Sequence, residues 1–249
     1  MPLQKTSAIV IKNIDWSDTS KITTLFTREF GKMNVIAKGA RRSSSPYRGL
    51  LESLNLIEVF IYFSPKRDLQ TLGDITLENS FHAIRGNIEK TGYALGILEL
   101  VNSFFGNSNP DSIFFDFTEH IFCELEITHK EEEIFWYYLL KLASYLGFKP
   151  EFILCRKCGK KVTDDVKNFS LQEGSVVCNS CALPDANQIK ILKSDSEYLF
   201  SIQTTNYKKI SSLGRLKNRH LNFTDFLIYY IQYHTGQKIE LSGLKLISG

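Results

Sequence analysis

The stretch KITTLFTREFGKMNVIAKGARRSSSPYR, from Lys21 to Arg48, decides the first part of the fold. Residues typical of β-strands alternate with basic residues up to Lys38, and a loop rich in Arg, Ser and Gly follows. The stretch contains seven basic residues and one acidic residue, Glu29, so its net charge is 7 − 1 = +6. The whole chain of 249 residues has a formal net charge of only +3. The positive charge is therefore concentrated in one segment, as expected for a surface that binds a polyanion.

The basic side chains of this stretch are the predicted nucleic-acid contacts. A single lysine or arginine is usually a solvated surface residue, but seven in one segment with one acid favour binding to phosphates. Tyr47, Phe26 and Phe30 are candidates for stacking on bases, although the interior of a barrel explains the two phenylalanines better. The predicted contacts are Lys21, Arg28, Lys32, Lys38, Arg41, Arg42 and Arg48.

Short β-type runs recur throughout the first 80 residues. Their alternation predicts five strands, at about residues 7–14, 22–26, 33–38, 54–63 and 69–77. Five short strands at this spacing favour a small OB-like β-barrel, a fold that binds oligonucleotides on its second and third strands. We therefore predict an OB-like nucleic-acid-binding domain over residues 1–80.

Helical periodicity replaces the β pattern after residue 80. Helices are predicted at about 91–105, 114–127, 131–146, 195–202 and 223–234. The predicted fold class is α+β, with the barrel followed by a mainly α-helical domain that carries a cysteine-containing insert. The predicted division is 1–80 for the barrel, 81–153 and 185–249 for the two parts of the helical domain, and 154–184 for the insert.

Four of the five cysteines form two CxxC pairs, with 19 residues between the pairs. Two CxxC turns at this spacing can place four thiolates around one Zn²⁺ ion, and a closed four-cysteine site is structural rather than catalytic. A redox-active CxxC is less favoured, because it would need one pair in a βαβ unit. We therefore predict a zinc-ribbon-like insert stabilised by structural Zn²⁺, and we expect the fifth cysteine, Cys123, to be buried. The predicted ligands are Cys155, Cys158, Cys178 and Cys181.

Motifs of enzymes and of export are missing from the sequence. There is no phosphate-binding GxxxxGK[ST] loop, no GxGxxG, no GxSxG and no HExxH, and the five histidines are scattered. The first residues do not resemble a secretory signal, and the densest apolar run is too short to span a bilayer. We expect a cytoplasmic, nucleoid-associated protein that is not an enzyme and does not contact membranes.

The run from Asp18 to Arg42, DTSKITTLFTREFGKMNVIAKGARR, resembles the N-terminal signature of the bacterial RecO family of recombination mediators. The order of a β domain, a helical domain and a CxxC…CxxC insert agrees with that family. The resemblance implies a non-enzymatic role in DNA repair and homologous recombination. It implies binding to single- and double-stranded DNA, with Arg28, Lys32, Lys38, Arg41 and Arg42 as phosphate contacts.

The resemblance also implies partners. Family members anneal complementary strands and act with RecR to help load RecA onto strands coated by single-strand-binding protein. They bind the acidic tail of that protein, for which a basic groove beside Phe223, Phe226 and Tyr230 is one candidate here. From the residues alone, an RNA-binding accessory factor of the ribosome or of transcription is the alternative, and a zinc-dependent hydrolase is a third reading.

Overall fold

The structure is a computed structural model that describes residues 2–107, 109–182, 187–216 and 218–247. The chain forms two compact units, the first from Met1–Ile127 with Glu240–Gly249 and the second from Thr128–Ile239. The mixed α+β composition, with the strands of the first 80 residues preceding the main helices, is confirmed. The four-part division of the sequence remains a prediction, and its insert boundary at residues 183–184 lies outside the described residues.

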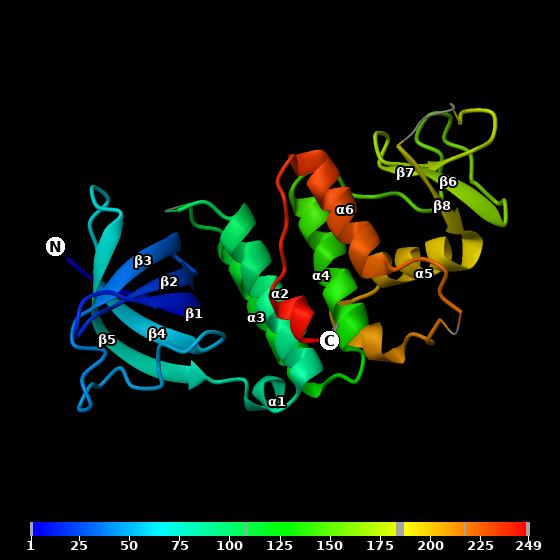
Figure 1. The fold of residues 1–249 in the computed structure, drawn as a ribbon. Helices are drawn as coiled ribbons and strands as arrows, with labels where there is room; N and C mark the ends of the chain where they lie inside the picture. The colour runs from blue at the N-terminus through cyan, green and yellow to red at the C-terminus, as the bar shows by residue number, and fades with distance from the viewer. Residues whose placement is uncertain (1, 108, 183–186, 217, 248–249) are drawn as a thin grey trace. The chain divides into compact units, whose positions relative to one another are not determined.

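Five strands close the N-terminal barrel in the order β1-β2-β3-β5-β4 (Figure 1). Strand β1 pairs with β4 through its first half and with β2 through its second half, which closes the sheet. All neighbouring strands are antiparallel except β3 and β5, which are parallel. The strands are β1 (Leu3–Asp15), β2 (Lys21–Thr27), β3 (Gly31–Ala37), β4 (Leu56–Tyr62) and β5 (Leu69–Asn79). The five predicted strands and their OB-like arrangement are confirmed.

A bulge in β1 decides which of its side chains face outward. The pairing of β1 with β2 shifts by one residue between Val10 and Lys12, so Ile11 is the extra residue. Ala8 and Val10 point into the barrel core. Strict alternation would place Lys12 and Ile14 on the same inner side. The bulge reverses the alternation, and both side chains are exposed.

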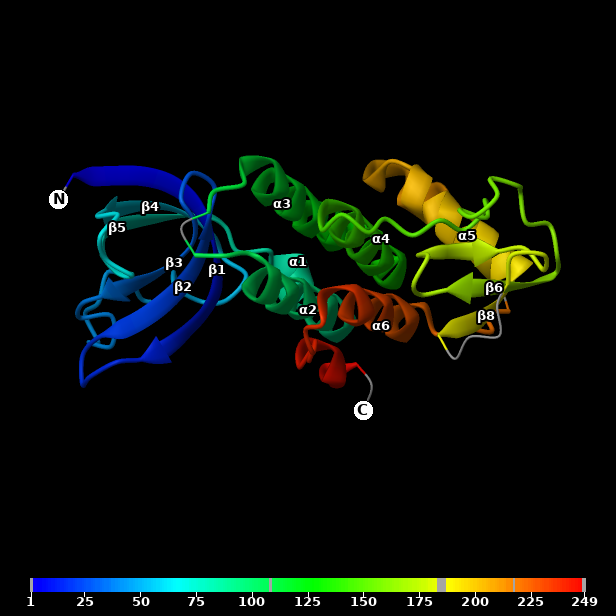
Figure 2. The same ribbon diagram turned by 90° about the horizontal axis from the view of Figure 1, so that it is seen from above.

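Helices cover one part of the outer face of the barrel, within the same unit (Figure 2). Phe26 points away from the core on β2, and its ring lies 5.3 Å from that of Phe105 and 5.5 Å from that of Phe115. Phe26 is fully buried by this contact. The elements of this layer are α1 (His82–Arg85), α2 (Ile88–Phe104) and α3 (Ser112–Ile127).

The C-terminal segment returns to the first unit and packs on α2. Its 3-10 turn, η2 (Gly243–Leu246), lies against Gly92 and Gly96 of α2, where the missing side chains allow the backbones to approach closely. The amide of Gly243 donates to a carboxylate oxygen of Glu99 at 3.3 Å. The two glycines four residues apart in α2 are therefore explained by this close packing.

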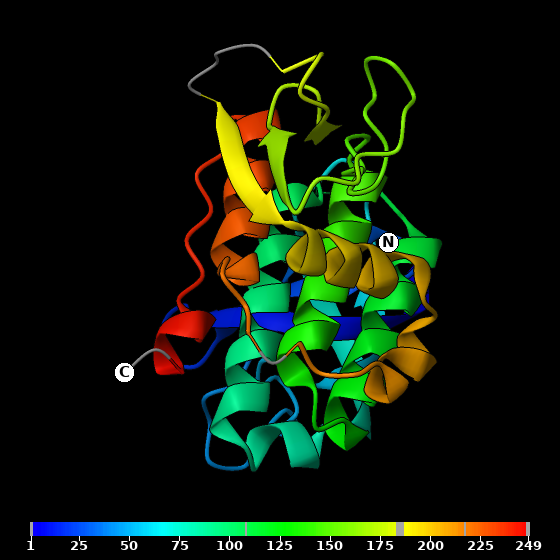
Figure 3. The same cartoon turned by 90° about the vertical axis from the view of Figure 1, so that its right-hand side faces the viewer.

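The second unit combines helices with a three-stranded sheet in the order β7-β6-β8. Figure 3 shows β8 running directly into α5. Helix α4 is almost entirely buried, as its apolar sequence predicts. The elements are α4 (Glu131–Tyr145), β6 (Val166–Ser170), β7 (Ser175–Val177), β8 (Gln188–Leu192), α5 (Lys193–Thr204), η1 (Tyr207–Ser212) and α6 (Phe223–Thr235). No helix of the described chain has both the length and the apolarity needed to cross a membrane.

A buried lysine joins the small sheet to α5. Lys167 of β6 is 2 % exposed, and its ammonium group donates to Ser196 Oγ at 3.0 Å and to the carbonyl of Phe152 at 3.4 Å. Burial lowers the pKa of Lys167. Ser196 also donates to the same carbonyl at 2.5 Å, so the three groups form one buried polar cluster.

The packing of η2 on α2 predicts that Gly243→Ala destabilises the protein. A Cβ atom at this position would lie 2.7 Å from the carbonyl oxygen of Gly92 and 2.8 Å from the amide nitrogen of Gly96. Overpacking of this kind costs about 1–3 kcal/mol, so the Tm should fall by roughly 2–10 °C in a thermal melt followed by circular dichroism. Gly106→Ala is the matched control, because a Cβ atom added there would meet no atom within 4 Å. Equal melting of the two variants would contradict this packing.

Candidate nucleic-acid interface and metal site

The basic residues predicted to contact nucleic acid differ in whether their side chains already have hydrogen-bond or ion-pair partners within the protein. Lys38, Arg42 and Arg48 follow β3, are exposed, and form no side-chain hydrogen bond or ion pair with any other described residue. Lys21, at the start of β2, reaches Asn13 at 3.5 Å. Arg28, Lys32 and Arg41 have closer partners, which restrict what these side chains can bind.

Arg28 is held by an ion pair with α3. Its Nε donates to Oδ1 of Asp116 at 2.7 Å and its Nη2 donates to Oδ2 at 2.9 Å. This hydrogen bonding raises the pKa of Arg28 and lowers the pKa of Asp116. Both side chains remain partly exposed, so the pair contributes modestly to stability. A phosphate at Arg28 would have to compete with a carboxylate that already neutralises it.

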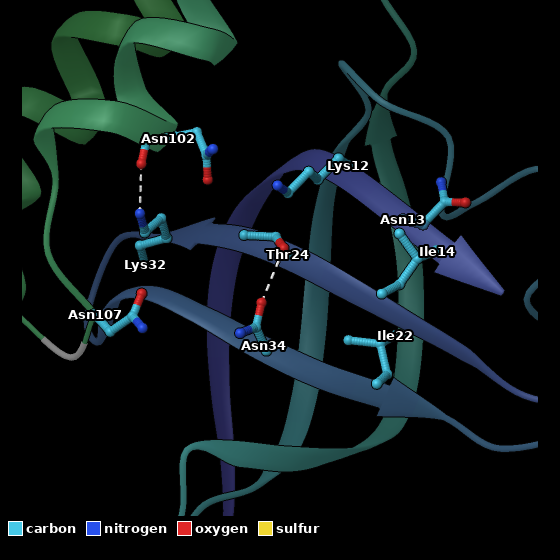
Figure 4. Close-up of a pocket in the computed structure, with 9 residues that line it drawn as sticks. All are labelled: Lys12, Asn13, Ile14, Ile22, Thr24, Lys32, Asn34, Asn102 and Asn107. Atoms are coloured by element: carbon cyan, nitrogen blue, oxygen red, sulfur yellow. Dashed lines mark hydrogen bonds between the residues drawn. The ribbon is translucent and has the colours of Figure 1, made fainter. Parts of the chain in front are cut away.

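Lys32 lines a cavity of about 420 Å³ on the outer face of β1, β2 and β3 (Figure 4). Its ammonium group donates to the backbone carbonyl of Asn102 in α2 at 2.5 Å. Burial lowers the pKa of Lys32, and the nearby charge of Lys12 lowers it further. Thr24 and Asn34 form the floor of the cavity and are joined by a hydrogen bond of 2.8 Å.

A second cavity of about 370 Å³ lies beside the ends of the same strands. Its lining includes Lys38 and Arg42, together with Trp16 from the β1–β2 turn and Ile36 from β3. Arg41 is excluded from this lining, because its guanidinium group is held by Asp15 Oδ2 at 3.3 Å and by the carbonyl of Ser17 at 2.7 Å. The two cations and the aromatic ring make this cavity the best match to the predicted basic surface.

Lys12 and Trp16 line the two cavities but are not among the contacts predicted from the sequence. Lys12 lies in a strand whose alternation points it inward, and only the bulge at Ile11 turns it outward. Trp16 falls in a turn of polar residues, yet its side chain is 53 % exposed beside the second cavity. An isolated lysine in an apolar strand and an aromatic residue in a polar turn are both local signals that could have indicated these two positions.

The aromatic residues predicted as stacking candidates pack against other parts of the protein, Phe26 fully buried and Phe30 and Tyr47 half-buried. Phe26 is buried, although between the barrel and the helices rather than in the barrel core. Phe30 packs against the core and lies 4.7 Å from the ring of Phe63. Tyr47 also packs on the core, and its hydroxyl donates to the carbonyl of Gly73 at 2.8 Å. The expectation of a barrel-core position is confirmed for Phe30, which packs on that core, and was wrong for Phe26, whose ring packs on Phe105 and Phe115 instead.

The four CxxC cysteines converge in the second unit. Their sulfur atoms all lie within 4.8 Å of one another, and Cys158 Sγ lies 3.6 Å from Cys178 Sγ. A tetrahedral ion with metal–sulfur bonds of about 2.3 Å separates its ligand sulfurs by about 3.8 Å. The spacing of these thiols therefore fits a four-coordinate metal ion. Cys123 lies apart and is exposed, so the expectation that it is buried was wrong.

Backbone hydrogen bonds close both cysteine turns. The amide of Gly159 donates to the carbonyl of Cys155 at 2.7 Å, and Gly159 has a φ of 73°, which favours glycine. In the second turn, the amide of Cys181 donates to the carbonyl of Cys178 at 2.9 Å. The hydroxyl of Ser180 lies 3.2 Å from the sulfur of Cys178, and hydrogen bonding from it and from the neighbouring cysteines lowers the pKa of Cys178. These turns hold the sulfurs in position, and a thiolate is the form that binds metals.

The aromatic residues predicted to border a groove for an acidic tail are part of the hydrophobic core instead. Phe223, Phe226 and Tyr230 on α6 are 0–3 % exposed. Phe169 of β6 packs on two of them, 5.2 Å from the ring of Phe226 and 5.6 Å from that of Tyr230. The core explanation of these aromatics is therefore correct. Lys217, a basic residue shortly before this helix, lies outside the described residues.

Two family models together account for almost the whole chain. The model described as recombination protein O N terminal matches residues 1–81, and the model described as recombination protein O C terminal matches residues 85–242. The chain belongs to the RecO family. The N-terminal family model covers the barrel. The C-terminal family model begins in α1 and ends just before η2.

Curated RecO proteins resemble the chain over most of its length. The DNA repair protein RecO of Salinibacter ruber is 35% identical over 69% of this chain and 66% of its own length. That of Oceanobacillus iheyensis is 28% identical over 93% of this chain and 88% of its own. That of Alkaliphilus metalliredigens is 29% identical over 93% and 94%, respectively. The family resemblance inferred from residues 18–42 is therefore confirmed.

The convergence of the four sulfurs predicts one bound metal ion per chain. Inductively coupled plasma mass spectrometry of the purified protein should find about one equivalent, and Cys158→Ser should lose it because one ligand is removed. Cys123→Ser is the matched control, since this cysteine lies outside the cluster, and it should retain the metal. A protein that folds with no metal, or a Cys158→Ser variant that retains a full equivalent, would refute the site.

Proposed function

We propose that this RecO-family chain binds DNA on the open outer face of its barrel and anneals complementary strands during homologous recombination. The observation that carries the proposal is the free positive charge beside the second cavity. Lys38 and Arg42 both line it and have no acidic partner among the described residues. Exposed cations of this kind bind phosphates without reading the bases, which annealing of arbitrary sequences requires.

Among the predicted contacts, Lys38, Arg42 and Arg48 are the strongest candidates for phosphate binding, because no described carboxylate pairs with their charges. Lys21 also has no acidic partner in the described part of the chain, and it is the first residue of β2. Arg41 and Arg28 are weaker candidates, because Asp15 and Asp116 hold them. Lys32 contributes positive charge from a half-buried position.

The metal of the second unit is proposed to be a structural Zn²⁺ ion held by Cys155, Cys158, Cys178 and Cys181. Four thiolates leave no open position for water, so the ion would stabilise the small sheet rather than react. The three strands of that sheet are short, and a metal supplies stability that so small a core lacks. RecR, the tail of single-strand-binding protein and, indirectly, the RecA filament are the proposed partners, on the basis of family membership.

The proposed role predicts that the protein accelerates the annealing of two complementary mixed-sequence DNA strands. A fluorophore and a quencher placed on opposite strands report annealing directly, and the same pair of sequences in RNA tests the alternative of an RNA-binding factor. Faster annealing of DNA is the expected result, because bound cations reduce the repulsion between strands. A protein that leaves the rate for DNA unchanged and binds only RNA would contradict the proposal.

The free charge of Arg42 predicts that Arg42→Gln weakens binding to DNA of any sequence. Loss of one phosphate contact should reduce the slope of log affinity against log salt concentration by about 0.7–0.9, as measured by fluorescence anisotropy. Lys190→Gln removes the same charge from an exposed position on β8 and should leave the slope unchanged. Equal slopes for Arg42→Gln and the wild type would show that Arg42 does not touch the backbone.

A further inference from the structure

The open part of the outer barrel face carries two rows of side chains that cross three strands. The register of β1, β2 and β3 aligns residues from each strand directly opposite one another. One row is polar and the next is apolar. The member of each row on β1 lies just after the bulge. The polar row is Lys12, Thr24 and Asn34, and the apolar row is Ile14, Ile22 and Ile36.

The cavity over these rows has a positive charge that nothing in its lining neutralises. Lys12 and Lys32 both line it, and its nine lining residues, all in the described part of the chain, include no carboxylate. The Lys12 side chain has no hydrogen bond or ion pair with any other described residue. Two ammonium groups in one cavity repel each other, so an anion bound between them is favoured.

The polar row also presents hydrogen-bond donors at fixed positions. The hydroxyl of Thr24 donates to Oδ1 of Asn34 at 2.8 Å, which leaves the amide NH₂ group of Asn34 to face the cavity (Figure 4). Together with the ammonium group of Lys12, this amide can donate to phosphate oxygens or to the carbonyl oxygens of a nucleobase.

The apolar row would contribute to the binding of a nucleotide but not to that of a simple anion. Ile14 is 55 % exposed and lines the cavity with Ile22, although inorganic phosphate would gain nothing from either side chain. An unstacked base gains van der Waals contact and removes this apolar surface from water. The bases of a duplex are paired and stacked, so only a single strand can offer one.

We propose that this cavity is a subsite for one nucleotide of a single DNA strand, with its phosphate at Lys12 and its base on the isoleucine row. The inference deepens the proposed function and rests on it. Ile36 of the same row lines the second cavity, so the apolar surface connects the two. Lys32 lies in β3 and Lys38 directly follows that strand, so the backbone positions of these two lysines are about 20 Å apart.

Two variants separate the roles of phosphate and base. Fluorescence anisotropy would compare an ordinary 20-nucleotide single strand with an abasic strand of the same length, which keeps the phosphates and lacks the bases. Lys12→Gln should weaken binding to both strands several-fold and reduce the salt slope by about 0.7. Ile14→Ser should weaken binding to the ordinary strand by about threefold or more and leave the abasic strand unaffected. Because Lys12 and Ile14 are exposed, neither substitution disturbs the core.

Lys66→Gln is the matched control, since it removes the same charge from an exposed position of the barrel outside both cavities. It should bind both strands as the wild type does. If the wild type binds the ordinary strand but Lys12→Gln and Ile14→Ser bind it equally well, the subsite is refuted and the proposed function stands. If the wild type binds no DNA at all, the proposed function itself fails.

Discussion

The pairing of β1 with two neighbours is the constraint on which the first unit depends. The strand must pair with β4 through its first half and with β2 through its second half, and the bulge at Ile11 accommodates the change. At the bend, Val10 exchanges backbone hydrogen bonds of 2.9 Å with Leu54 and Asn55, so the loop before β4 satisfies the groups released from the ladder. Closure of the barrel and the outward direction of Lys12 therefore have the same cause.

The outer face of β2 and β3 has two roles, and each role belongs to a different part of the two strands. Near the β2–β3 turn, Phe26 and Arg28 attach the barrel to α2 and α3 through ring contacts and an ion pair. Farther along, Ile22 and Ile36 remain accessible and border cavities. A run of basic residues in one segment is thus divided between holding the fold together and presenting free charge to solvent.

Much of this arrangement could be predicted from local patterns, because alternation, helix periodicity and the CxxC spacing are properties of neighbouring residues. The rest depends on contacts between distant segments. Nothing near Arg28 in the sequence indicates that Asp116 neutralises it, and nothing near Lys167 indicates that Ser196 and Phe152 solvate it in the core. Short elements such as β8 and η2 were also missed, since their stability comes from packing rather than propensity.

The return of the C-terminal turn to α2 affects how the chain can fold during synthesis. The first unit contains residues from both ends of the sequence, and the second unit is an insertion between Ile127 and Glu240. The notch at Gly92 and Gly96 therefore stays uncovered while the ribosome makes more than a hundred further residues, because the segment that fills it follows the whole second unit in the sequence. The barrel can close early, but the unit around it is completed only after the second unit has been synthesised.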